Sequence, residues 1–158
     1  MDTILKLEPR EKPEFQFKSQ PLPRSNALVL LGLTLLFLAT RLTNLTQLPI
    51  FNDEAVYLNW ARMIQTGETG PFISVLADNK KPLQIWLTAL IGEILDDPLE
   101  AGRLTSTLAG WVCLMGIYFT ATRLFSRLTG TLAALIYILC PYTLLFNRLA
   151  HESSLLSA

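Results

Sequence analysis

Three long runs of uncharged residues constrain this chain more than any other feature of its sequence. The runs contain 16, 19 and 20 residues and lie between Arg24 and Arg41, Arg103 and Arg123, and Arg127 and Arg148. An α-helix rises about 1.5 Å per residue, so about 20 residues are needed to cross the roughly 30 Å of hydrocarbon in a bilayer. The second and third runs meet that requirement, which predicts an all-α membrane protein.

The first run is short for a membrane span unless Arg41 snorkels, with its guanidinium lifted towards the lipid headgroups. The uncharged sequence resumes after Arg41 and continues to Asn52, so we predict a first span over residues 26–45. A cleaved signal peptide would also contain an apolar run, but no small-x-small cleavage pattern follows this one. The second and third spans are predicted over residues 105–122 and 129–147.

The balance of residue types also favours a membrane protein. Of the 158 residues, 51% are hydrophobic and 16% are charged, whereas about 25% are charged in an ordinary soluble domain. The formal net charge is zero, so bulk electrostatics indicate no nucleic-acid partner. The two cysteines, Cys113 and Cys140, lie inside apolar runs and are expected to be small buried hydrophobic residues.

The distribution of charge predicts the orientation of the spans. Residues 1–25 form a polar tail, and the short connection 123–128 carries Arg123 and Arg127 with no acidic residue. Basic residues concentrate in short cytoplasmic loops, so we expect both segments in the cytoplasm. The first outer loop, residues 46–104, then carries eight acidic and four basic residues. Residues 148–158 are expected to form an outer loop and the start of a fourth span, which makes the chain an N-terminal fragment of a longer protein.

The first outer loop is expected to contain two juxtamembrane helices. The first begins with Asn52 as its N-cap and stops at Gly67. It places Asp53 and Glu54 in the first turn, where the helix dipole favours negative charge. Helical spacing puts Asp53 and Tyr57 on the same face.

The second of these helices begins at Pro82, a favoured first-turn residue, and continues to Leu95. It is too short to span a bilayer, so we predict an interfacial helix along the outer leaflet, anchored by Trp86. Its broad apolar side contains Leu83, Trp86, Leu87, Leu90, Ile91 and Ile94.

Polar groups just above a membrane can face an amphiphilic substrate whose head is in water. A carboxylate such as Asp53 is suited to accept a proton from an attacking hydroxyl, and Lys80 is suited to hold a lipid phosphate. On spacing alone, the simpler interpretation is that the acids begin a helix and the lysines lie beside anionic headgroups. The candidates are Asp53, Glu54, Lys80, Lys81, Arg103, Arg148, His151 and Glu152.

Five short landmarks occur in order over about residues 40–158. They are Arg41 in the first span, the D-E-x-x-Y pattern at 53–57, the lysine-proline helix start at 80–83 with a downstream tryptophan, the R-L-x-S pattern at 103–106, and an acidic residue, Glu152, after the third span. In this order they resemble the N-terminal third of the GT-C fold glycosyltransferases of the protein mannosyltransferase and lipid A aminoarabinose transferase superfamily. The resemblance implies a GT-C-type multi-span helical fold.

The resemblance also implies a reaction. Family members transfer a sugar from a polyprenyl-phosphate carrier to a protein or glycolipid acceptor on the outer face of the membrane, with inversion at the anomeric carbon. For this chain it implies a multi-pass protein of a bacterial inner membrane with a cytoplasmic N-terminus. The fragment alone is expected to be inactive, because the later spans of the family are missing from it.

Residue roles follow from position in the family pattern. Asp53 matches the first-loop aspartate that activates or orients the acceptor, Glu54 is its companion, and Glu152 matches the acidic residue after the third span. These three are the expected catalytic residues. The expected substrate-binding residues are Lys80, which matches the lysine suited to the carrier phosphate, and Tyr57 and Arg103, which shape the site.

The chain departs from the family at the lysine-proline helix start. Lys81 and Pro82 stand where the family has two prolines, and Asn79 stands where some lipid A-modifying members have a glutamate that binds a metal. The single histidine, His151, rules out a multi-histidine metal centre within this chain. The cofactor is therefore unknown, and this fragment does not support a divalent metal site.

Two other classes of protein are alternatives. A fragment of a polytopic transporter or flippase would carry ionisable residues within its spans, and the second and third runs contain no charged residue. A non-catalytic membrane adaptor would tolerate changes at Asp53, Lys80 and Glu152 alike.

Overall fold

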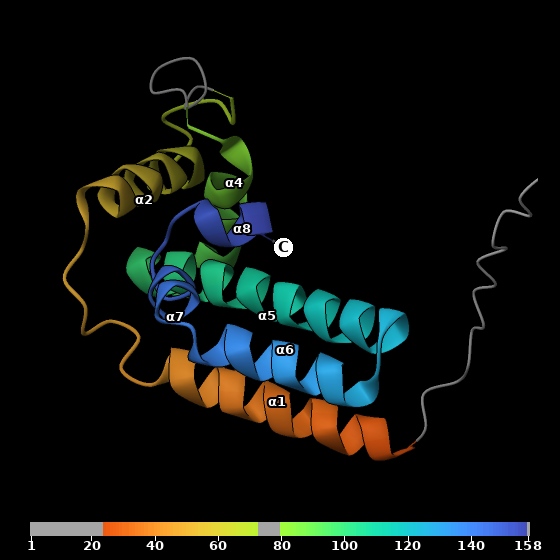
Figure 1. The fold of residues 1–158 in the computed structure, drawn as a ribbon. Coiled ribbons are helices and arrows are strands. Elements are labelled where there is room, and N and C mark those ends of the chain that lie inside the picture. The colour runs from red at the N-terminus through yellow and green to blue at the C-terminus, as the bar shows by residue number, and fades with distance from the viewer. Residues whose placement is uncertain (1–23, 73–79, 158) are drawn as a thin grey trace, which may run out of the picture.

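The computed structural model describes residues 24–72 and 80–157 (Figure 1). Within them every regular element is a helix, as predicted, and the tail at 1–25 lies outside the described residues except for its last two positions. The elements are α1 (Arg24–Leu42), α2 (Asn52–Gln65), α4 (Pro82–Gly92), α5 (Pro98–Leu124), α6 (Arg127–Leu139), α7 (Pro141–Phe146) and α8 (Ser153–Ser157).

Three helices, α1, α5 and α6, lie side by side, and α5 runs in the direction opposite to the other two (Figure 1). Buried apolar residues of all three make one core. Its members are Leu33 and Phe37 of α1, Cys113, Leu114 and Tyr118 of α5, and Ala134, Tyr137 and Ile138 of α6. Cys113 is buried, as predicted, whereas Cys140 is only partly buried.

The outside of this bundle is apolar too. Exposed aliphatic side chains include Leu31 and Leu35 on α1, Val112 on α5, and Ile136 on α6. The outer face of a helix in a soluble protein would carry polar residues instead. Among the described helices, α5 alone has the length and composition to cross a membrane, while the apolar parts of α1, α4 and α6 are shorter. The bundle therefore suits a lipid environment, and the number of spans stays a prediction.

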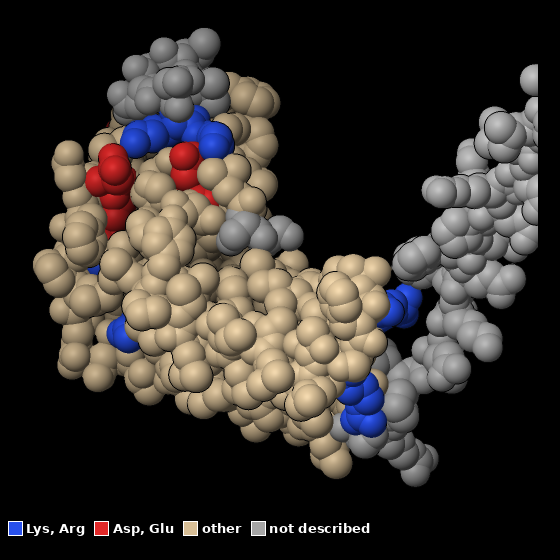
Figure 2. All heavy atoms as spheres, viewed as in Figure 1, with Lys and Arg blue, Asp and Glu red and all other residues tan. Residues whose placement is uncertain are grey.

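The two ends of the bundle carry different elements. The short connection between α5 and α6 lies at one end, and α2, α4 and α8 lie at the other (Figure 1). On the face drawn in Figure 2, acidic and basic side chains gather near α2 and α4, whereas the surface between the two ends shows no charged side chain. The division into a short cytoplasmic loop at 123–128 and a long outer loop at 46–104 stays a prediction.

The ends of α2 lie close to the predicted positions. Its N-cap is Phe51 instead of Asn52, so the expected cap is wrong by one residue. The backbone N–H of Phe51 donates to Glu54 Oε2 over 3.4 Å, so a first-turn carboxylate replaces the missing side-chain cap. The helix ends before Gly67, whose φ of 72° is left-handed and is readily adopted by glycine.

The helix α4 begins at Pro82, as predicted, but ends at Gly92 and not at Leu95. Its buried residues are Gln84, Ile85, Thr88 and Ala89. The apolar residues Leu83, Leu90 and Ile94 are exposed. The apolar side thus points away from the described part of the protein, which is the orientation that an interfacial helix needs.

The third predicted span, 129–147, falls on two helices instead of one. Proline has no N–H and cannot continue the hydrogen-bond ladder, so α6 ends at Leu139 and α7 begins at Pro141. The break frees carbonyl groups near the end of α6. Thr143 Oγ1 donates to the carbonyl of Tyr137 over 2.5 Å.

Arg41 satisfies the next of these carbonyls. Its Nη1 donates to the carbonyl oxygen of Ile138 over 2.8 Å, and its guanidinium lies 4.6 Å from the centre of the Phe37 ring. The side chain is 0% exposed, so the expectation that it snorkels to the headgroups is wrong. A cation at the C-terminal end of α6 is favoured by the helix dipole, which explains why the side chain turns inwards.

Candidate functional site

All six predicted site residues lie at the end of the bundle that carries α2, α4 and α8. They divide into two sets. Asp53, Lys80, Tyr57 and Glu152, together with Lys81 and His151, form a group that we call the polar cluster. Glu54 and Arg103 form a buried ion pair beneath it.

In the polar cluster, Asp53 and Lys80 contact each other directly. Asp53 is in the first turn of α2, and its Oδ1 lies 3.1 Å from Lys80 Nζ. The Asp53 side chain is 62% exposed and that of Lys80 is 25% exposed. Because ion pairs this exposed contribute about 0–1 kcal/mol to stability, the contact can be exchanged for one with a ligand at little cost.

Tyr57 lies beneath the two charged groups. It is 1% exposed. Lys80 Nζ lies 5.3 Å from the centre of its ring, and the ring of His151 meets it edge-on at 5.6 Å. Asp53 and Tyr57 lie one helical turn apart on α2 and share a face, as predicted, although the first is exposed and the second is buried. Lys80 connects them by contacting both.

The Tyr57 hydroxyl interacts with the carboxylate of Glu152. Burial raises the pKa of this hydroxyl, and a hydrogen bond with Glu152 and the charges of Glu152 and Asp53 raise it further. The phenol therefore stays protonated at neutral pH and can act only as a neutral hydrogen-bonding group. Lys81 Nζ lies 3.7 Å from Glu152 Oε1. The adjacent lysines 80 and 81 thus each face one carboxylate of the cluster.

The Glu54 and Arg103 pair is fully buried, at 1% and 0% exposure. Arg103 Nε donates to Glu54 Oε1 and Arg103 Nη2 donates to Glu54 Oε2, both over 2.8 Å. Arg103 Nη1 and Nη2 also donate to the carbonyl oxygens of Leu45 and Leu48, over 2.7 Å and 3.0 Å. A planar guanidinium suits this two-pronged contact with a carboxylate.

A third segment of the chain joins this pair. The backbone N–H of Ala150 donates to Glu54 Oε1 over 2.8 Å. Burial works against the charged form of Glu54, but the hydrogen bonds from Arg103 and Ala150 and the charge of Arg103 outweigh it, so the pKa of this carboxyl is lowered from its ordinary value of 4.5. The sequence contained no signal for the Ala150 contact, because a backbone donor is independent of residue type.

Small residues on α5 let the segment 147–151 approach this closely. A Cβ added to Gly110 would lie 2.5 Å from Asn147 Cγ, and one added to Gly102 would lie 2.7 Å from Ala150 Cβ. Thr107 Oγ1 of the same helix donates to the carbonyl of Asn147 over 2.9 Å. The helix therefore holds His151 and Glu152 beside α2.

A pocket of about 330 Å³ opens beside Asp53. Asn52, Asp53 and Glu54 line it from α2, Leu145 and Phe146 line it from α7, and Leu149 and His151 line it from the following segment. Its walls are mainly apolar with the Asp53 carboxylate at the edge, so it can hold a small group next to an exposed base.

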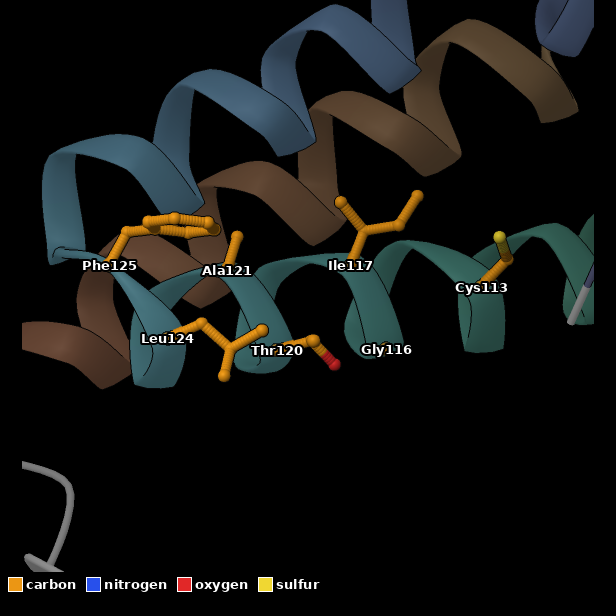
Figure 3. A pocket seen from close by; sticks show the side chains of 7 residues that line it. All are labelled: Cys113, Gly116, Ile117, Thr120, Ala121, Leu124 and Phe125. Carbon is orange, nitrogen blue, oxygen red and sulfur yellow. The ribbon is translucent and has the colours of Figure 1, made fainter. Parts of the chain in front are cut away.

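A second hollow, of about 410 Å³, lies along the C-terminal half of α5 (Figure 3). Its walls include Cys113, Ile117, Thr120 and Leu124, and none of its lining residues is charged. It lies at the other end of α5 from Arg103. This hollow therefore offers no group for proton transfer or phosphate binding, and the candidate site is the polar cluster.

No metal centre is apparent in the part of the chain that the structure describes, where no three histidine, cysteine or acidic side chains come together. Asn79, which stands where some family members have a metal-binding glutamate, lies outside the described residues.

One family model matches the chain, that of dolichyl-phosphate-mannose-protein mannosyltransferase, over residues 79–158. The match covers about half of the chain and includes Lys80, Arg103 and Glu152, whereas Asp53 precedes it. No curated protein and no solved structure matches the chain.

Proposed function

Because the chain belongs to the dolichyl-phosphate-mannose-protein mannosyltransferase family, we propose that it forms the acceptor-activating part of a membrane glycosyltransferase. The enzyme moves a sugar, of the mannose class, from a polyprenyl-phosphate carrier to a hydroxyl of an acceptor. The reaction takes place at the end of the bundle that carries the polar cluster, on the outer face of the membrane. The observation that carries the proposal is the meeting of an exposed carboxylate, Asp53, with a lysine, Lys80, beside a pocket.

Asp53 is the general base in this proposal. Its carboxylate takes the proton of the acceptor hydroxyl while the hydroxyl oxygen forms a bond to the anomeric carbon of the sugar. The bond between that carbon and the phosphate oxygen of the carrier breaks on the opposite side, which inverts the configuration. The exposure of Asp53, 62% against 1% for Glu54, supports this choice between the two neighbouring acids.

Lys80 receives the departing phosphate. The carrier leaves as a phosphate anion, and an ammonium group beside it stabilises the charge that develops as the bond breaks. Lys81 adds a second positive charge on the same segment. The donor phosphate is a diester with one negative charge, and the departing polyprenyl phosphate gains a second, so the two lysines stabilise the leaving group more than the donor. Their contacts with Asp53 and Glu152 are partly exposed, at 3.1 Å and 3.7 Å, so these carboxylates can give way to the phosphate.

Glu152 orients the acceptor. It follows His151, which lines the pocket beside Asp53, and a carboxylate accepts hydrogen bonds from the hydroxyl groups of an acceptor. Tyr57 is buried and interacts with Glu152 from beneath, so it orients Glu152 and not the acceptor itself. The roles are therefore a base at Asp53, a phosphate contact at Lys80, an acceptor contact at Glu152 and a supporting phenol at Tyr57.

The Asp53→Asn variant of the full-length protein tests the proposal. Membranes that contain it are given radiolabelled polyprenyl-phosphate mannose, and transfer of label to endogenous acceptors is measured. We expect a loss of about 100-fold or more, because a general base typically contributes about 10²–10⁴-fold in rate. Glu68→Gln, an exposed acid beyond the other end of α2, is the control and should keep full transfer. Unchanged transfer by Asp53→Asn would exclude the proposed base.

The same measurement separates the alternatives. A non-catalytic adaptor would show no transfer with any variant, including the unchanged protein. A transporter would move the labelled lipid between leaflets without joining the sugar to an acceptor. Formation of labelled product by the unchanged protein therefore excludes both.

A further inference from the structure

Glu54 is the meeting point of three segments that are far apart in the sequence. The carboxylate belongs to the first turn of α2, Arg103 brings α5 to it, and the N–H of Ala150 brings the segment that follows α7. Through the same guanidinium, the carbonyls of Leu45 and Leu48 are tied to the pair. One buried carboxylate therefore joins the segments that lie beneath the polar cluster.

The residues that carry out the proposed reaction lie next to these contacts in the sequence. Asp53 directly precedes Glu54, and Glu152 lies two residues after Ala150. The hydrogen bond from Ala150 to Glu54 is therefore a short link between the backbone of the proposed base and the backbone of the orienting acid. A shift in this link moves one carboxylate relative to the other.

We propose that Glu54 and Arg103 are a pair of positioning residues that set the distance between Asp53 and Glu152, an inference that rests on the proposed function. Neither residue touches the substrate. Both side chains are buried, both Glu54 oxygens are occupied by donors from Arg103, and further donors come from Ala150 and Phe51. This assignment replaces the expected roles of Glu54 in catalysis and of Arg103 in substrate binding.

The pair is suited to positioning because its two hydrogen bonds form only in one relative orientation of the two side chains. A carboxylate that accepts two parallel hydrogen bonds from a guanidinium is held in orientation as well as in place. Glutamine at position 54 has the same shape but turns an N–H₂ group towards Arg103 and either Ala150 or Phe51, where only donors lie. Lysine at position 103 keeps the charge but cannot donate to Glu54, Leu45 and Leu48 from one rigid plane.

The first experiment measures kcat and KM for the Glu54→Gln and Arg103→Lys variants of the full-length protein in membranes. A misplacement of about 1 Å between reacting groups can cost about 100-fold in rate, so we expect kcat to fall by about that factor. The KM for polyprenyl-phosphate mannose should change less than about threefold, because Lys80 and Lys81 are untouched. Protease resistance of each variant reports whether it is folded.

Thr105→Val is the matched control. Thr105 is buried on α5, two residues after Arg103, and donates to the carbonyl of Ala101 in its own helix, so the variant removes a buried hydrogen bond that links α5 neither to α2 nor to the 147–151 segment. A purely stabilising role for Glu54 predicts that Glu54→Gln and Thr105→Val lower kcat alike once corrected for folded protein. The positioning role predicts that Thr105→Val keeps kcat within about threefold of the unchanged protein.

A second measurement does not depend on activity. Spin labels on Asn59→Cys in α2 and Leu156→Cys in α8, both exposed positions, report the separation of the two elements by pulsed electron resonance. The native cysteines are replaced by Cys113→Ala and Cys140→Ala. Glu54→Gln should broaden or shift the distance distribution, and an unchanged distribution would overturn the inference. If Asp53→Asn retains transfer while Glu54→Gln shifts the distances, the proposed function fails and the positioning pair stands.

Discussion

Lys80 Nζ lies 3.1 Å from Asp53 Oδ1, so the proposed phosphate contact and the proposed base neutralise each other in the free protein. The Asp53 side chain is exposed, and that of Lys80 is partly exposed and rests over the buried ring of Tyr57. A phosphate that binds Lys80 would release Asp53 at the moment when the donor is in place. The direct contact thus links the two halves of the proposed reaction.

Replacement of Lys80 should weaken donor binding and leave the fold intact. In Lys80→Gln the charged contact with the phosphate is lost, and we expect the KM for polyprenyl-phosphate mannose to rise about tenfold or more. The exposed ion pair with Asp53 contributes little, so the free energy of unfolding should change by less than about 1 kcal/mol. Arg62→Gln, which removes the same charge from an exposed position on α2, should change neither quantity.

Loss of Arg41 should destabilise the end of α6. Arg41→Ala leaves the buried carbonyl of Ile138 without its 2.8 Å donor, and an unsatisfied buried polar group costs about 1–3 kcal/mol. We expect a loss of that size in the free energy of unfolding, measured by chemical denaturation in detergent micelles. Arg123→Ala removes an exposed arginine at the end of α5 and serves as control. Equal stability of the two variants would argue against the capping role of Arg41.

A methyl group at Gly110 should force α5 and the 147–151 segment apart. The new Cβ in Gly110→Ala would lie 2.5 Å from Asn147 Cγ, and Asn147 is held by Tyr137 and Ser154. Overpacking of this kind costs about 1–3 kcal/mol.

Gly116→Ala is the matched change on the same helix. Nothing lies within 4 Å of its added Cβ, and alanine is a better helix former than glycine by about 1 kcal/mol. This variant should therefore be as stable as the unchanged protein or more so. Thermal unfolding of both variants in detergent provides the comparison, and destabilisation by Gly116→Ala as large as that by Gly110→Ala would contradict the packing argument.

The lowered pKa of Glu54 predicts a pH dependence of stability. A carboxyl whose pKa is lower in the folded than in the unfolded protein stabilises the fold above its unfolded pKa, and this contribution is lost as the pH falls through the folded pKa. The loss should therefore occur below the ordinary value of 4.5. Above that value, the unchanged protein should exceed Glu54→Gln in unfolding free energy by a constant amount, and the difference should shrink as the pH falls. A difference independent of pH over this range would contradict the assignment.

Much of the helical structure follows from local signals. Pro82 begins α4, the left-handed Gly67 follows the end of α2, and Asp53 and Glu54 lie in the first turn of α2, all as their residue types predict. These features depend on backbone preferences within a few residues. The N-cap at Phe51 differs by one residue because the Glu54 carboxylate supplies the capping contact.

The partners of buried charges could not be predicted in the same way. Arg41 was expected to reach towards solvent, but the break before Pro141, about 100 residues away in sequence, offers it a carbonyl in the interior. The apolar side of α4 was visible in the sequence, but periodicity does not say which side packs. Gln84 and Thr88 form part of the side that packs against α5. Gln84 can be buried there because the carbonyl of Gly102 and the hydroxyl of Ser106 accept hydrogen bonds from its amide.

The sequence by itself determined the helical class, the start of α4, the approximate ends of α2 and the family resemblance, and it supplied the candidate site residues. Only the tertiary structure decided which of two adjacent acids is buried. Asp53 and Glu54 differ by 100° around α2, and that rotation directs Glu54 to Arg103 and Ala150 while Asp53 remains at the surface with Lys80. Local preference treats the two carboxylates alike, because both favour the start of a helix. Their separation depends on contacts with α5 and the 147–151 segment, which exist only when the chain is folded.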